Sequence, residues 1–170
     1  AEGEAKKAVV RLLQAAGGPE ALKSLRSVIS YAEGEVRDTA LRTLCGWPTP
    51  EALPAIVGLV KDPPNPTIKA LATRGAVRLL RTSPVEIEDK LRHYSTLMEN
   101  AGSAGNKRTI LSGLATVGHR RALDLALGQM DAPDVKAEAL QAATSIAPRV
   151  GTDARIEKLP YLWANVDEWR

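Results

Sequence analysis

Phenylalanine is absent from this 170-residue sequence, and aromatic residues of all kinds make up only 4% of it. The strands of a β-sandwich favour aromatic and β-branched side chains, so this composition argues against a sandwich. Alanine and leucine dominate instead, and both favour helices. No apolar run approaches the length of a membrane-spanning helix, so the sequence predicts no such helix.

Cysteine and histidine are almost absent too. Cys45 has no second cysteine to pair with, and no general base lies beside it in the sequence, so we expect an inert core thiol. His93 and His119 have no histidine or cysteine at a metal-ligand spacing. The glycines form neither a phosphate-binding loop nor a dinucleotide fingerprint. We therefore expect no catalytic residue, no cofactor and no metal site: the protein is predicted not to be an enzyme.

The excess of positive charge is small, with 23 Lys and Arg against 20 Asp and Glu. A dedicated nucleic-acid binder usually shows a stronger bias. The excess lies in residues 1–83, whose 12 basic and 8 acidic side chains give +4. The sequence opens Ala-Glu-Gly-Glu with no signal-like segment, which is typical of a mature or excised piece of a longer chain, and the localisation stays unknown.

Apolar or small residues recur in a fixed pattern along the chain. We number each occurrence from its first residue, so that the shared residues stand at positions 0, 4, 5 and 8 of the pattern. Three segments fit, starting at Val36, Ile68 and Val135, and a fourth starting at Asn106 fits except at position 0. Position 1 is always a cation: Arg37, Lys69, Lys107 and Lys136. The starts recur with a mean spacing of roughly 33 residues, which indicates a helical repeat.

Proline and glycine divide the chain into about ten predicted helices. Pro50 and Pro84 would begin two of them, each behind a good N-cap residue, Thr49 or Ser83. The predicted helices span residues 3–16, 19–32, 35–46, 50–61, 66–82, 84–101, 104–117, 119–130, 133–148 and 153–164.

Residues 51–72 carry the most informative segment, Glu-Ala-Leu-Pro-Ala-Ile, then Asp62, then Thr-Ile-Lys-Ala-Leu-Ala. Together with residues 123–140 it resembles a HEAT repeat, in which a first helix containing proline precedes a second helix that opens on an aliphatic residue and a cation. The period is short, closer to the compact bacterial HEAT-like kind. The resemblance covers residues 19–150 and weakens where Asn106 replaces the aliphatic residue.

The resemblance implies an all-α fold, a right-handed α-α superhelix (α-solenoid) of about four to five stacked antiparallel helix pairs. Residues 1–170 would form one array. Residues 1–18 would be a leading unpaired helix, residues 19–150 the repeats, and residues 151–170 a C-terminal capping segment. Its aromatic residues Tyr161, Trp163 and Trp169 either cap the last repeat, which we favour, or contact a following domain. Trp47 would plug an inter-repeat turn.

The repeated cations have a structural interpretation. On a helical wheel Arg37 falls in the middle of the apolar face, where a charge must be paired. The resemblance implies that such cations and the turn aspartates hold neighbouring repeats together. The predicted inter-repeat residues are Arg37, Lys69, Lys107, Lys136, Asp62, Asp131 and Asp134.

For Arg42 and Arg74 the sequence predicts a different role, because both stand at position 6 of the pattern and face solvent on the wheel. Arg78 and Arg81 extend this side of the same long helix. The strip is either a solvated face or a docking site for an acidic partner, and these four arginines are the candidate partner-binding residues.

Two functional classes remain open. The leading hypothesis is a monomeric, non-catalytic protein-interaction or scaffolding module of a larger protein, binding a protein partner or adjacent domains of its own chain. The alternative is a nucleic-acid-binding protein similar to the HEAT-like DNA-repair glycosylases. Such glycosylases need aromatic side chains in a basic cleft, and here only Trp47 lies near the basic helices, so nucleic acid is the less favoured partner.

Overall fold

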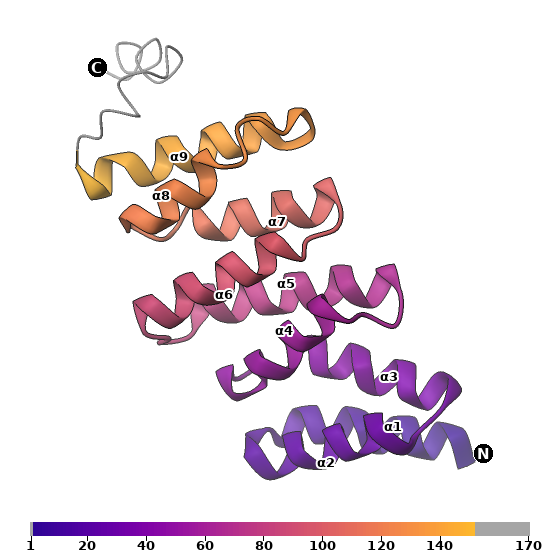
Figure 1. Ribbon diagram of the computed structural model, residues 1–170. Coiled ribbons are helices and arrows are strands. Elements are labelled where there is room, and N and C mark those ends of the chain that lie inside the picture. Colours follow the sequence, from indigo (N-terminus) through magenta and orange to yellow (C-terminus); the bar gives the residue numbers. More distant parts are fainter. Residues whose placement is uncertain (1, 152–170) are drawn as a thin grey trace. The chain divides into compact units, whose positions relative to one another are not determined.

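The computed structural model describes residues 2–151, and these residues are all-α with no strand among them (Figure 1). The all-α prediction is confirmed. The elements are α1 (Glu2–Ala16), α2 (Gly18–Tyr31), α3 (Gly34–Cys45), η1 (Pro50–Ala52), α4 (Leu53–Lys61), α5 (Pro66–Thr82), α6 (Ile87–Glu99), α7 (Ala104–Leu114), α8 (Arg120–Leu127), η2 (Pro133–Val135) and α9 (Lys136–Val150). The helix predicted at 153–164 and the cap predicted at 151–170 lie outside the described residues, apart from Gly151.

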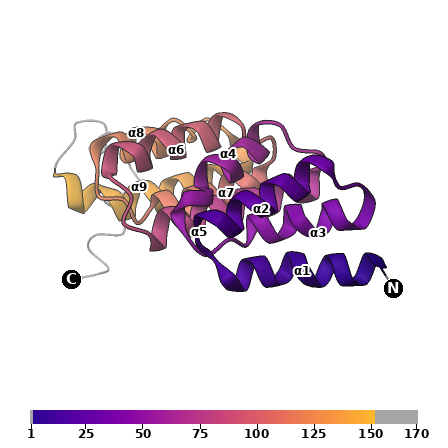
Figure 2. The ribbon, with the colours of Figure 1, turned by 90° about the horizontal axis from the view of Figure 1, so that it is seen from below.

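The described residues divide into two compact units, the first ending at Asn106 and the second beginning at Lys107. In the first unit α2 packs against α3 and α4 against α5, each pair joined by a short connection. The second helices of these pairs form a layer with α1, in the order α1, α3, α5, and α2 and α4 lie over it (Figure 2). The predicted stacking of helix pairs is therefore confirmed within this unit.

The core of the first unit lies between these two layers. It is built from aliphatic side chains at helical spacing, including the fully buried Leu25, Ile56 and Ile68. Each such side chain contributes roughly 1.5–3 kcal/mol on burial. Trp47 is fully buried where α3 ends, as the plug interpretation expects.

Three helices begin three residues later than predicted. One is α9, which begins at Lys136 after η2 rather than at residue 133. For the other two, proline explains the difference. The segment 50–61 is split into η1 and α4, because Pro54 has no N–H to donate to the carbonyl of Pro50. Helix α6 begins at Ile87 rather than Pro84. Ser83 ends α5 with an extended backbone (ψ 149°), the conformation that a residue before proline favours, so it is a C-cap and not an N-cap.

In the second unit α8 packs against α9, and α7 contributes its residues from Lys107 onward. His119 precedes α8 and accepts a hydrogen bond at Nδ1 from the backbone N–H of Arg121, at 3.2 Å. This N-cap was not predicted from the sequence.

Candidate interaction surface

Arg42 on α3 and Arg74 on α5 are both exposed, as the helical wheel predicts. They stand at position 6 of their repeats, on second helices that pack side by side. Arg42 also pairs with Asp38 one turn earlier, with Nε 2.6 Å from Oδ2. Both side chains of this pair are about half exposed, so the pair contributes well under 1 kcal/mol and leaves Arg42 accessible.

Arg78 has a different role from the other candidates. Its Nη2 donates to the backbone carbonyl of Trp47 at 2.5 Å, and the residue is half-buried. Arg78 thereby ties α5 to the end of α3, where a cation also interacts favourably with the helix dipole. Arg81, one turn further on, is exposed.

Arg11 belongs with Arg42 and Arg74, although sequence reasoning missed it. Helix α1 carries the repeat pattern at Ala5, Val9, Val10 and Leu13, with the cation Lys6 at position 1. Arg11 therefore stands at position 6, and it is exposed. The layer α1, α3, α5 thus presents Arg11, Arg42 and Arg74 from equivalent positions, and we call these three residues the arginine row.

The expected pairing of the position-1 cations is not formed. In the described part of the chain no ion pair joins Arg37, Lys69, Lys107 or Lys136 to Asp62, Asp131 or Asp134. Arg37 and Lys136 are exposed, and Lys69 and Lys107 are half-buried. All three aspartates are exposed as well. A wheel describes the direction of a side chain, but these residues lie at the starts of their helices, where less of the neighbouring helix covers them.

Lys69 does lie beside the following repeat. A β-carbon built on Gly102, in the turn before α7, would stand 3.0 Å from Nζ of Lys69. This position fits the predicted inter-repeat role without the predicted carboxylate partner, because the long side chain can lie along the surface with its charge in water.

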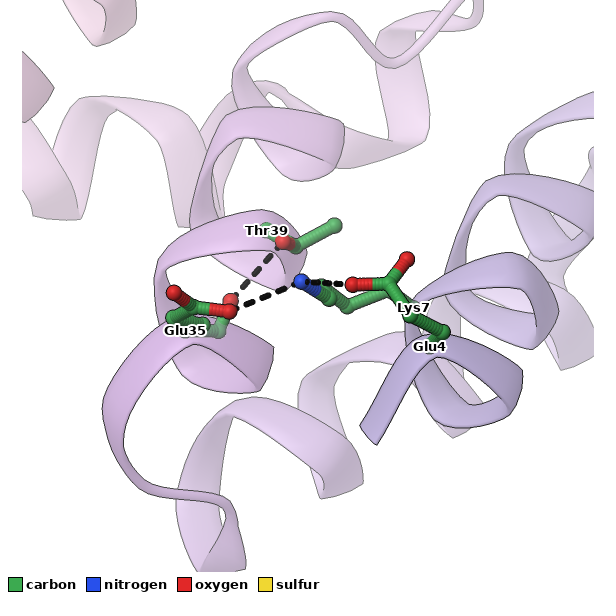
Figure 3. Close-up of polar contacts among 4 residues, drawn as sticks. All are labelled: Glu4, Lys7, Glu35 and Thr39. Carbon is green, nitrogen blue, oxygen red and sulfur yellow. Dashed lines mark hydrogen bonds and ion pairs between the residues drawn. The ribbon is translucent and has the colours of Figure 1, made fainter. Parts of the chain in front are cut away.

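The charged link between neighbouring second helices is made by other residues. Lys7 of α1 lies 2.8 Å from Glu35 Oε2, in the first turn of α3, and 2.5 Å from Glu4 Oε1 (Figure 3). Hydrogen bonding to Glu35 and then Glu4 raises the pKa of Lys7. Thr39 donates its hydroxyl to the backbone carbonyl of Glu35 at 2.8 Å.

The second unit holds an equivalent link between α7 and α9. Arg108 Nε lies 2.9 Å from Glu138 Oε1, and its Nη2 donates to the backbone carbonyl of Asp134 at 2.8 Å. Lys7 and Arg108 both stand at position 2 of their repeats. The signal that could have found them is therefore a cation at position 2, one residue beyond the cations that the sequence analysis selected.

Side chains also satisfy backbone carbonyls where second helices end. Gln14 Nε2 donates to the carbonyl of Gly46 at 2.8 Å, and Arg149 Nη1 donates to that of Ala115 at 3.3 Å. These carbonyls have no partner within their own helix. The contacts are structural and hold neighbouring second helices in register.

Burial shifts the pKa values of several titratable groups away from their ordinary values. Cys45 is buried, as the prediction of a core thiol expects, and burial raises the pKa of its thiol to about 11. Burial also lowers the pKa of His93. Among the described residues no cluster of three or more histidine, cysteine, aspartate or glutamate side chains could hold a metal ion. No described helix combines the length and apolar character that crossing a membrane requires.

Stacked helix pairs with a recurring pattern define a helical-repeat protein. Residues 1–79, from the start of α1 into α5, match the family model described as HEAT repeats. Residues 1–79 are therefore similar to HEAT repeats, which supports the predicted family, and the match includes α1, which the sequence analysis had set apart as a leading helix. No curated protein and no solved structure matches the chain.

Proposed function

We propose that the chain is a non-catalytic protein-interaction or scaffolding module of a larger protein, and that the arginine row together with Arg81 docks an acidic partner. HEAT repeats generally mediate protein–protein interaction or scaffolding, and the family is typically non-catalytic. The observation that carries the proposal is the exposure of Arg11, Arg42 and Arg74 at one repeat position on three adjacent helices.

The geometry favours a partner that follows the layer of second helices. Packed helices lie about 8–10 Å apart, so cations at equivalent positions recur at this distance. A chain in the polyproline II conformation rises about 3.1 Å per residue with three residues per turn, so every third side chain points the same way about 9 Å further on. A segment with acidic side chains at every third residue would therefore meet Arg11, Arg42 and Arg74 in turn.

The test uses a fluorescein-labelled deca-glutamate peptide as the probe, titrated with the protein at low and physiological salt. We expect Arg42→Glu/Arg74→Glu to weaken peptide binding at least tenfold at low salt, and we expect salt to weaken binding to the unmodified protein. The matched control is Lys23→Glu/Arg26→Glu, which reverses two exposed cations of α2 and changes the net charge equally. The control should weaken binding less than twofold.

Equal losses in both double variants would show that only net charge matters, and would overturn the docking strip. A parallel titration with duplex DNA tests the alternative function. Micromolar or tighter DNA binding with a steep dependence on salt would favour a nucleic-acid-binding protein instead.

A further inference from the structure

Helix α1 exposes side chains at positions that other second helices bury. Positions 4, 7 and 11 of the repeat lie on one face of the helix, since they are three and four residues apart. Their residues are Ala40, Thr43 and Trp47 in α3 and the turn after it, Ala72, Gly75 and Leu79 in α5, and Ala139, Ala142 and Ile146 in α9, all of which are buried. In α1 they are Val9, Leu12 and Ala16, and all three are exposed, Val9 by 55% and Leu12 by 65%.

Position 7 faces the preceding second helix. A β-carbon on Gly75 of α5 would stand 2.1 Å from the backbone carbonyl oxygen of Cys45 at the end of α3. This contact fixes the direction in which the face points, toward the second helix of the repeat before it. Leu12 is the equivalent residue of α1, so the exposed face of α1 points away from α3.

The exposed side of α1 continues into an apolar groove at the end of α2. The groove holds about 570 Å³ and is lined by Ala5, Val9 and Val10 of α1, by Val28 and Tyr31 of α2 and by Val36 of α3. Tyr31 is 72% exposed. Of the four large apolar side chains exposed in the described residues, three are Val9, Leu12 and Tyr31. A gathering of this kind marks an interaction surface rather than ordinary scatter.

We infer that the face formed by Val9, Leu12 and Ala16 packs against a further helix pair of the same kind, supplied by the same polypeptide ahead of residue 1. This inference rests on the proposed function as a module of a larger protein. This occupant follows from continuity, because the face repeats, position for position, the face that α3 and α5 turn toward the preceding second helix.

The contacts of α3 specify the chemistry of the occupant. Glu35, one residue before the repeat start at Val36, forms an ion pair with Lys7 of α1, the preceding helix of the same layer. Glu4 stands at the same place in α1, and its carboxylate is 72% exposed. The second helix of the added pair should therefore run parallel to α1, start one repeat length before Ala5, and carry Lys or Arg at position 2 to meet Glu4.

The experiment compares residues 1–170 with the same chain extended upstream by two repeat lengths of its own coding sequence, each with and without Leu12→Asp. In residues 1–170 the exposed Leu12 should tolerate aspartate, with a melting temperature within about 2 °C of the parent. In the extended chain the same change places a charge in a packed interface, and the melting temperature should fall by about 6–12 °C. Ile87→Asp, at an exposed apolar residue of α6, is the matched control and should shift both chains equally.

Three results would overturn the inference: an upstream sequence without a helix of this pattern, an equal effect of Leu12→Asp in both chains, or a dimer of residues 1–170 that Leu12→Asp dissociates in sedimentation. The last would make the face a contact between two copies. Binding of the acidic peptide is measured separately on the arginine row, so its failure would leave the melting-temperature comparison unaffected.

Discussion

At Gly75 two second helices of the first unit approach each other closely. A methyl group there would stand 2.1 Å from the carbonyl oxygen of Cys45 and 3.1 Å from its carbonyl carbon, and backbone atoms cannot move aside as a flexible side chain can. We expect Gly75→Ala to lower the free energy of unfolding by about 2 kcal/mol or more, measured by urea denaturation.

Gly58 offers the matched control within α4. It is exposed, and a β-carbon there would meet no atom within 4 Å. Gly58→Ala should raise the free energy of unfolding by up to about 1 kcal/mol, because alanine is the better helix former. A loss of stability in Gly58→Ala comparable to that in Gly75→Ala would show that the close contact is not the cause.

Cys45 permits a prediction about pH. Its thiol pKa is raised to about 11 by burial, so at pH 8 only about a thousandth of the folded protein carries the reactive thiolate. Alkylation by iodoacetamide should therefore be slow in the folded state, should accelerate as the pH rises toward 11, and should become fast at pH 8 in denaturing urea. Rapid reaction of the native protein at pH 8 would contradict the burial of this thiol.

Predictions for single residues succeeded where it was enough to know whether a side chain points toward solvent or toward the core. The wheel placed Arg42 and Arg74 on an exposed side, and they are exposed. It could not show that Arg78 reaches the Trp47 carbonyl, because that contact depends on how α5 lies against the end of α3. It also placed Arg37 on a buried face, yet Arg37 is exposed in the first turn of its helix.

At the scale of elements, the link between α7 and α9 depends on Arg108. We expect Arg108→Ala to lower the free energy of unfolding by about 0.5–1 kcal/mol, since the pair with Glu138 is half exposed but a hydrogen bond to the Asp134 carbonyl is lost too. Lys136→Ala, at an exposed residue of the same unit, is the control and should change stability by less than about 0.5 kcal/mol. A double-mutant cycle with Glu138→Ala isolates the ion pair. A coupling energy of zero would show that the link does not stabilise the unit.

Periodicity in the sequence predicted that the described helices exist, but it predicted their first and last residues less well. Periodicity depends on residues within one helix, which the sequence contains in full. The start of α6 depends instead on Ser83 being extended before Pro84, and the start of α4 on the missing N–H of Pro54. Both are local effects of proline, and both shifted a predicted start by three residues.

At the scale of the whole molecule, stability should be graded along the first unit. Repeats contact only their neighbours, so each helix is held by the elements beside it. Helix α5 has a neighbour in each layer and buries Ile68, Leu79 and Leu80 completely, whereas α1 has an exposed apolar face. Backbone amides of α5 should exchange with solvent most slowly and those of α1 fastest, which hydrogen-exchange mass spectrometry measures by peptide. Uniform protection from α1 to α5 would contradict this gradient.

The repeats share a pattern but not an exchangeable interface. The residue at position 7 is buried in both α3 and α5, but it is Thr43 in one and Gly75 in the other, so the side chain between neighbouring second helices differs in size from one junction to the next. A recombination event that duplicated, deleted or shuffled whole repeats would bring a leucine or threonine to a junction shaped for glycine. The order of the repeats is therefore fixed by packing, and array engineering on this scaffold would have to redesign position 7 at every new junction.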